Sequence, residues 1–350
     1  MSPGPPVEWS SLALEVLHGG RLTCGPRVER FERAFAEFVG SRFAVCVNSG
    51  SSANLLLTAA LGLQPMDKVL VPVLTWPTTV APVIQLGLRP VWIDARADTF
   101  QMDAEDANEE MDRFTGAIWV AHLMGNAVDL DALELPKGAY LLEDCCDAFG
   151  TRYNWRHVGT FGLAGTFSFF MTHQLMTGEG GMIVTDDETL AEKLRSMRSH
   201  GWVRTAKNPF WFQELGFNFR PTELTGAWGE QQLEAWPDAY LTRRERAGEM
   251  GGVRGVESME LTAGVDPSWF AWVVRSKRRE EGMDALTLAG VETRPLLGGS
   301  LLNQPAFAPF GRAGDYPVAA MLGRETFYWP LHQGMSEHDT AHIRSVVENA

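Results

Sequence analysis

The chain has 350 residues and a formal net charge of −14, from 30 basic and 44 acidic side chains. With 45% apolar and 21% charged residues, it has the composition of a folded globular protein of about two domains. The acidic balance excludes broad binding to the phosphate backbone of nucleic acids. No apolar stretch approaches the roughly 18 residues of a membrane span, so we expect neither nucleic acid nor membrane as a partner.

The beginning of the chain and its cysteines predict the compartment. The first nine residues contain neither the basic nor the apolar region of a secretion signal. The four cysteines are too few for a disulfide framework, and their spacing misses the usual zinc patterns. We therefore predict a cytoplasmic protein with reduced cysteines and no bound metal.

The first two hundred residues alternate short apolar runs with helix-like segments. The runs are often continuous rather than alternating, which is typical of strands buried on both faces. This order predicts an α/β fold with a mainly parallel sheet. The predicted strands are 43–47, 69–73, 90–94, 117–121, 140–143, 166–170 and 182–185, and the predicted helices are 52–63, 78–86 and 187–199.

The second half of the chain predicts a change of domain. A long helical pattern covers 222–246, and glycines become frequent around 248–255. The remainder is typical of a smaller α+β unit. We predict an N-terminal arm over 1–35, a large α/β domain over 36–247 and a small C-terminal α+β domain over 248–350.

Three segments could carry chemistry. Segment 48–53 (NSGSSA) stands where a strand turns into a helix, and free N–H groups there can bind an anion, with Ser51 and Ser52 as further donors. Serine at such a turn also serves simply as a helix N-cap.

Segment 143–147 (EDCCD) follows a predicted strand directly. Ligands of parallel α/β sheets bind at the carboxyl ends of the strands, so Asp144 or Asp147 could meet a cationic ring nitrogen. A solvated acidic turn is the alternative.

Segment 166–181 leads from one strand through a glycine-rich turn into the next, and it places Ser168 and His173 around one loop. Histidine titrates near neutral pH and can transfer protons, although loop histidines are often merely exposed.

Together with further motifs, these segments resemble the sugar aminotransferase family of pyridoxal-phosphate proteins. The further motifs are Gly25-Pro26 with Phe31-Glu32, segment 215–220 (LGFNFR), segment 292–296 (ETRPL) and Gln304-Pro305. The resemblance runs from about Leu22 to the C-terminus in the family's order. It implies the aspartate-aminotransferase-type fold, known as fold type I.

One position departs from the aminotransferases. Where they carry the lysine that binds the cofactor as an imine, this chain has His173, and none of its five lysines lies in that loop. Histidine there marks a smaller branch, the nucleotide-sugar 3-dehydratases, which act on 4-keto-6-deoxyhexoses. Segments 75–80 (TWPTTV) and 121–126 (AHLMGN) also resemble that branch.

The resemblance implies a reaction and a set of roles. Pyridoxal 5′-phosphate or pyridoxamine 5′-phosphate would be the cofactor, a ketosugar of the GDP-4-keto-6-deoxymannose type the substrate, and glutamate the amino donor. His173 would be the acid/base, Asp144 the partner of the pyridinium nitrogen, and Trp76 the ring-stacking residue. Asp147 would lie near the cofactor's ring hydroxyl. The phosphate would be held by Ser51, Ser52 and Ser168, and by Asn218 of the second subunit in a homodimer with shared active sites.

Some positions depart from the branch as well. Gly299-Ser300 stands where the family usually has Gly-Asn, and the stretch 199–214 is short. Three arginines, Arg204, Arg220 and Arg294, are candidates for binding carboxylate or diphosphate groups. Two alternatives remain open: an aminotransferase whose lysine has been replaced, and a binding protein of this fold without turnover.

Overall fold

The computed structural model describes residues 9–203 and 208–349, and its centre is a seven-stranded sheet of order β1-β9-β8-β5-β4-β2-β3. All neighbours from β8 to β3 are parallel, and β9 is antiparallel to both of its neighbours. The predicted mainly parallel sheet is confirmed, with each strand within two residues of its expected position. The strands are β1 (Phe43–Val47), β2 (Lys68–Pro72), β3 (Arg89–Ile93), β4 (Thr115–Ala121), β5 (Tyr140–Asp144), β8 (Ala164–Ser168) and β9 (Gly181–Thr185).

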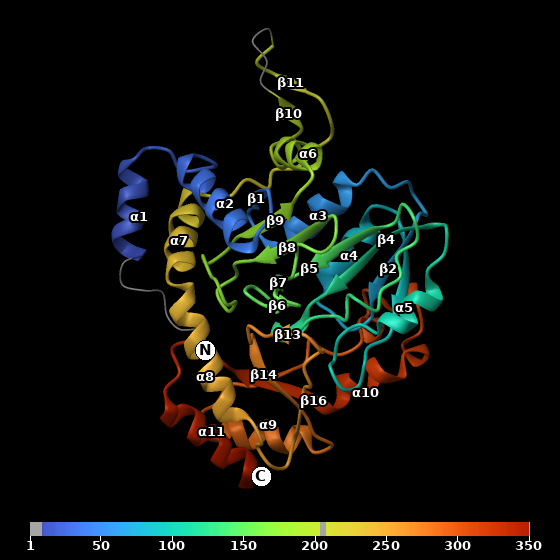
Figure 1. Cartoon of the computed structure of the whole chain (residues 1–350), viewed down its shortest axis with the longest axis vertical. Helices are drawn as coiled ribbons and strands as arrows, with labels where there is room; N and C mark the ends of the chain where they lie inside the picture. Colours follow the sequence, from blue (N-terminus) through green and yellow to red (C-terminus); the bar gives the residue numbers. More distant parts are fainter. Residues whose placement is uncertain (1–8, 204–207, 350) are drawn as a thin grey trace.

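Helices cover both faces of this sheet (Figure 1). The three predicted helices are present. Two begin at a side-chain cap, since Ser49 accepts from Ser52 N–H and Asp187 from Leu190 N–H, and the second helix begins with Pro77 without such a cap. A fourth, α5, was not predicted. These helices are α3 (Gly50–Ala60), α4 (Pro77–Gln85), α6 (Glu188–Arg198) and α5 (Ala104–Glu110).

The N-terminal segment packs on the large domain through α1 (Trp9–His18) and α2 (Pro26–Val39). The rings of Trp9 and Trp228 stack with centroids 4.4 Å apart, and Phe31 and Phe35 are fully buried in the core. Helix α2 runs across the predicted boundary at position 35. The division into arm, large domain and small domain stays a prediction.

The helical pattern over 222–246 forms two helices rather than one. They are α7 (Glu223–Glu234) and α8 (Trp236–Met250), and Ala235 separates them. Pro237 lies in the first turn of α8, where its missing N–H costs no hydrogen bond. Inside one continuous helix, Pro237 would lack the backbone N–H that bonds the carbonyl four residues earlier. This explains why the helix breaks there.

The C-terminal part is a four-stranded antiparallel sheet of order β12-β14-β16-β15 with helices around it (Figure 1). Its elements are β12 (Glu257–Ser258), β14 (Ala271–Arg275), β15 (Arg294–Pro295), β16 (Thr326–Pro330), α9 (Arg279–Leu288), α10 (Pro317–Glu325) and α11 (Glu337–Asn349). Short 3₁₀ turns are η1 (Leu123–Gly125), η2 (Leu301–Asn303), η3 (Ala308–Phe310) and η4 (Ala313–Asp315).

Two further small sheets complete the architecture. One joins β13 (Val265–Asp266), β6 (Arg152–Tyr153) and β7 (Arg156–His157). The other, β10 (Trp202–Val203) with β11 (Trp211–Phe212), protrudes from the body beyond α6 (Figure 1). No helix within the described ranges is long and apolar enough to cross a membrane.

Candidate active site

A cavity of about 1210 Å³ opens at the carboxyl ends of the parallel strands, between the large sheet and the C-terminal sheet. Six of the eight site residues predicted from the sequence line it. They come from four separate segments of the chain, at the ends of strands and the starts of helices, so only the folded chain brings them together. The six are Ser51, Trp76, Asp144, Asp147, Ser168 and His173. The other two, Ser52 and Asn218, do not line the cavity of this chain.

One end of the cavity is built to receive an anion. A Cβ added at Gly50 would lie 2.7 Å from the Cβ of Ser168, so only glycine lets the first turn of α3 approach that serine. Ser51 is exposed there, and its hydroxyl donates to Thr78 Oγ1 at 3.0 Å. N–H groups of this turn and the hydroxyls of Ser51 and Ser168 can therefore meet a phosphate. Ser52 forms part of the cap, since its N–H donates to Ser49 Oγ at 3.1 Å.

Asp144 ends β5 and is 6% exposed. Its Oδ2 accepts from Thr79 Oγ1 at 2.7 Å and from Asn54 Nδ2 at 2.8 Å, and its Oδ1 accepts from Cys146 N–H at 3.1 Å. Thr166 holds Asn54 in turn by donating to its Oδ1 at 2.6 Å. Three donors directed at one carboxylate fix its orientation, and a carboxylate held in this way can pair with a pyridinium N–H.

His173 lies in the loop after β8, partly exposed toward the cavity. The Phe270 ring packs edge-on against its imidazole, with centroids 5.3 Å apart, and Phe170 packs similarly at 6.0 Å. Burial, and then the charge of Arg243, lower the pKa of His173 to about 4. At neutral pH the ring is therefore uncharged and able to accept a proton.

Asp147 faces the same cavity. Burial, and then the charge of Asp144, raise the pKa of Asp147 to about 7. Burial, and then the charge of Asp147, also raise the pKa of Tyr328 to about 12. Asp147 therefore keeps its proton at pH values at which an ordinary aspartate has lost it.

The pKa values of Asp147 and His173 predict opposite effects on stability. Between about pH 4 and 7 the folded chain keeps the Asp147 proton that the unfolded chain has released, so this group lowers stability as pH rises. Between about pH 4 and 6.5 the unfolded chain protonates His173 and the folded chain does not, so this group raises stability as pH rises. Replacing Asp147 by asparagine removes only the first effect.

We expect the free energy of unfolding of Asp147→Asn to rise more steeply from pH 4.5 to 6.5 than that of the wild type, measured by urea denaturation. The exposed Asp284→Asn should follow the wild type, and equal slopes for Asp147→Asn would contradict the raised pKa.

Trp76 stands at the rim of the cavity, immediately before α4, with 58% of its surface exposed. A large indole facing an open cavity can cover an aromatic ligand. An anion-binding turn, an oriented carboxylate and an exposed indole on one cavity fit a phosphorylated pyridine. Ser51 and Ser168 would hold its phosphate, Asp144 its ring nitrogen and Trp76 its face.

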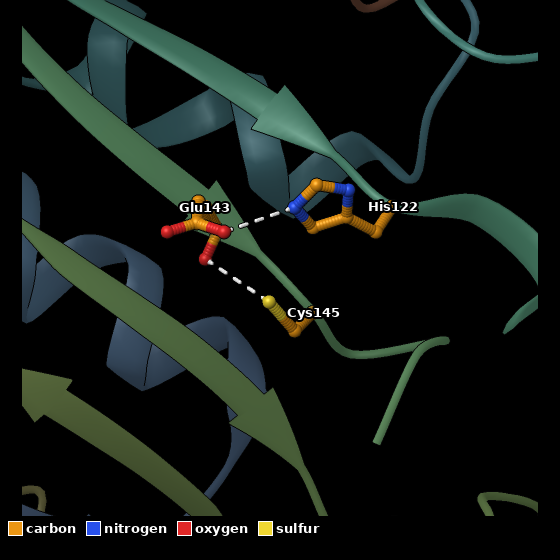
Figure 2. A group of neighbouring side chains, drawn as sticks. All are labelled: His122, Glu143 and Cys145. Carbon is orange, nitrogen blue, oxygen red and sulfur yellow. Dashed lines mark hydrogen bonds and ion pairs between the residues drawn. The ribbon is translucent and has the colours of Figure 1, made fainter. Parts of the chain in front are cut away.

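At the end of β5, next to the cavity, His122, Glu143 and Cys145 form a fully buried group (Figure 2). Val128 N–H donates to His122 Nδ1 at 3.2 Å, which assigns the proton to Nε2, and Nε2 donates to Glu143 Oε2 at 3.2 Å. Burial raises the pKa of Cys145 well above its usual value, so the sulfur stays a thiol. Both ring nitrogens of His122 and both carboxylate oxygens of Glu143 are engaged in hydrogen bonds, so this group acts as a hydrogen-bonded support for β5.

Glu143 ties that support together. Its Oε1 accepts from Phe161 and Gly162 N–H groups at 2.7 and 2.8 Å, and its Oε2 accepts from Gly159 N–H at 2.7 Å as well as from His122. These four hydrogen bonds all point at the Glu143 carboxylate.

In Glu143→Gln the new NH₂ group would face two donors in either orientation. We expect a loss of about 3–5 kcal/mol in the free energy of unfolding, measured by urea denaturation. The exposed Glu134→Gln should stay within about 0.5 kcal/mol of the wild type, and an equally small change at Glu143 would contradict this support role.

The sequence reasoning missed several residues of the site. Thr79 and Asn54 stand within or beside segments already singled out, and a polar side chain one helical turn from a motif is a usable signal. Arg243 and Tyr328 also line the cavity, but each is close only in space. Of the three candidate arginines, Arg294 lines the cavity, Arg220 does not, and Arg204 lies outside the described residues.

The chain is similar to known proteins over nearly its whole length. The model of the DegT/DnrJ/EryC1/StrS aminotransferase family matches residues 8–348. A GDP-4-keto-6-deoxy-D-mannose 3-dehydratase of Yersinia pseudotuberculosis is 34% identical over 91% of this chain and 90% of its own length. The Escherichia coli enzyme of that name with bound hydrated PLP superposes with a TM-score of 0.93 at 31% identity, covering 99% of this chain and 98% of that one. A GDP-4-keto-6-deoxymannose-3-dehydratase with a trapped PLP-glutamate geminal diamine gives the same TM-score, identity and coverage. The fold is therefore fold type I, and the chain belongs to the DegT/DnrJ/EryC1/StrS aminotransferase family.

Proposed function

We propose that the protein is a nucleotide-sugar 3-dehydratase that uses pyridoxal and pyridoxamine phosphate. The observation that carries this proposal is that His173 lines the same cavity as Asp144. By the resemblance of the sequence, His173 stands where the aminotransferases have their lysine. A lysine would both bind the cofactor as an imine and transfer protons. Histidine can only transfer protons, so a sugar joined to the cofactor's amine is not displaced by a lysine of this loop.

The proposed mechanism assigns one task to each side chain. Pyridoxamine phosphate, held by Ser51, Ser168, Asp144 and Trp76, would supply the electron sink for loss of a proton and of the C3 hydroxyl of the sugar. His173, uncharged at neutral pH, takes that proton and can return it to the departing hydroxyl. Asp144 stays oriented by Thr79 and Asn54 so that the ring remains electron-withdrawing. Trp76 orients the ring.

The substrate we propose is a ketosugar of the GDP-4-keto-6-deoxymannose type, with glutamate as the amino donor. The relatives named above support it by their names, one of them by its bound PLP-glutamate adduct. The cavity is large enough for a sugar nucleotide beside the cofactor. Arg294 on its wall is exposed at the edge of the cavity, where it pairs with Glu292, and its guanidinium can bind a diphosphate there.

We further propose a homodimer in which Asn218 reaches the phosphate in the partner's site. Asn218 is exposed and lies outside the cavity of its own chain. Close to it in sequence, the protruding segment exposes Phe210, Trp211, Phe212 and Leu215, at 71%, 52%, 58% and 94% of their surfaces. Exposed apolar side chains of this number are typical of an interface. Light scattering should give about twice the 38.7 kDa of one chain, and a monomer would contradict the shared site.

The cytoplasm is the compartment we propose. All four cysteines are unpaired, and two of them are fully buried as thiols. Free thiols of this kind suit a reducing compartment.

One incubation tests the function. The protein is mixed with pyridoxal phosphate, glutamate and GDP-4-keto-6-deoxymannose, and the sugar products are followed by mass spectrometry. A 3-dehydratase gives a sugar nucleotide that has lost one oxygen atom. A product with nitrogen on C4 and no deoxygenation would instead identify an aminotransferase with a replaced lysine. No change with any nucleotide ketosugar would indicate a binding protein without turnover.

A further inference from the structure

Arg243 of α8 is a buried cation without an anionic partner among the residues that the structure describes. It is 2% exposed, and its three hydrogen bonds all go to uncharged oxygens. Nε donates to Gln333 Oε1 at 3.0 Å, and Nη1 donates to the carbonyls of Trp269 at 2.8 Å and Leu331 at 2.7 Å. Burial lowers the pKa of Arg243 to about 9, which still leaves the guanidinium charged at neutral pH. A buried charge held only by neutral oxygens lowers the stability of the fold, and a functional role would account for its presence.

The geometry connects Arg243 to His173. Both side chains line the same cavity. The carbonyl of Trp269, which accepts from Arg243, directly precedes Phe270 in the chain. The Phe270 ring packs on the His173 imidazole at an interplanar angle of 84°. The guanidinium therefore anchors the segment that holds one side of the imidazole in place.

The other charged groups of the cavity are engaged elsewhere. Asp144 accepts three hydrogen bonds, Asp147 keeps its proton up to about pH 7, and Glu292 pairs with Arg294. Glu179, His332 and Tyr328 also line the cavity. Among all of these, Arg243 is the group whose charge acts on His173, where it adds to the effect of burial.

We propose that Arg243 is a positioning residue for the acid–base step of the proposed function. Through Trp269 it holds the Phe270 ring against His173, and its unpaired positive charge disfavours a second positive charge on the imidazole. The unpaired charge is thereby explained, since a carboxylate partner would cancel its effect on the histidine. Like charges close together in a protected site disfavour each other, so the imidazolium form is the one penalised.

The test separates the charge of Arg243 from its packing. Arg243→Gln removes the positive charge, whereas Arg243→Lys keeps it. Gln333→Glu leaves the guanidinium in place and offsets its charge with a carboxylate, because Gln333 Oε1 is the atom that accepts from Arg243 Nε. Arg244→Gln is the matched control. Arg244 is the next residue in the chain, its side chain is half exposed, and it pairs with Asp266 outside the cavity. Two quantities are measured on the cofactor-loaded protein: the protonation of His173 by NMR titration, assigned with His173→Asn, and the pH profile of the glutamate-driven spectral change of the cofactor.

We expect Arg243→Gln and Gln333→Glu to raise the pKa of His173, and Arg243→Lys and Arg244→Gln to leave it near the wild-type value. The ratio of conversion rates at pH 5.5 and pH 8 should fall about threefold in the first two variants, because more of the base is protonated at the lower pH. Thermal melting identifies any variant that fails to fold, and Gln333→Glu then decides alone.

Wild-type titration of His173 in both Arg243→Gln and Gln333→Glu would overturn the inference. So would a shift in Arg243→Lys as large as in Arg243→Gln, since the effect would then come from packing. A wild-type protein that does not react with glutamate would refute the proposed function instead. The NMR titration would still decide the role of Arg243.

Discussion

His173→Asn is expected to slow the glutamate-driven conversion of the bound cofactor by about 10²–10⁴-fold, because asparagine cannot accept or return a proton. Asparagine is close in size to histidine and keeps a polar group toward the cavity. Cofactor binding should therefore persist, since the groups proposed to hold it, Asp144, Trp76 and Ser168, are unchanged. The measurement is stopped-flow absorbance after mixing the pyridoxal-phosphate form with glutamate, with cofactor affinity determined in parallel.

The matched control is His338→Asn, which makes the same replacement at an exposed position on α11. It should convert at the wild-type rate. Conversion by His173→Asn at the rate of this control would remove His173 from the acid–base role. The proposed dehydratase mechanism would then need another proton acceptor on the cavity wall.

Asp144→Asn is expected to lower turnover by about 10²–10³-fold, the range found when one preorganised electrostatic group is removed from an active site. The asparagine oxygen can still accept from Thr79 and Asn54, and its NH₂ group would face Cys146 N–H at the cost of one hydrogen bond. The side chain carries no charge to favour a protonated ring nitrogen. We therefore expect a lower rate of proton removal and a weaker affinity for the cofactor, with only a modest loss of stability. Turnover, cofactor affinity and urea denaturation measure the three effects.

Asp284→Asn serves as its control, because Asp284 is an exposed aspartate of α9 that does not line the cavity. It should leave all three quantities unchanged. Wild-type turnover in Asp144→Asn would exclude Asp144 as the partner of the ring nitrogen. A collapse of stability with no measurable folded protein would direct the test to Asn54→Ala, which removes one of the donors that orient Asp144.

The strands and most of the helices of the large domain could be predicted from the sequence, for a local reason. A strand buried on both faces needs a continuous apolar run, and a helix needs a cap at its start, and both signals lie within about ten residues. The helix break at Ala235 was missed although Pro237 marks it. The apolar pattern of 222–246 continues across the proline, because both helices bury one face.

The replacement of the lysine by His173 is likewise visible in the sequence alone, because one loop position decides it. Tertiary structure decided what surrounds that histidine. Arg243 and Phe270 are 70 and 97 positions away along the chain, and nothing near them in sequence indicates a site. Burial and the charge of Arg243 lower the pKa of His173, and burial with the charge of Asp144 raises that of Asp147. The residue types of the site were therefore set by the sequence, whereas their protonation states follow from burial and from charges that only the folded chain brings close.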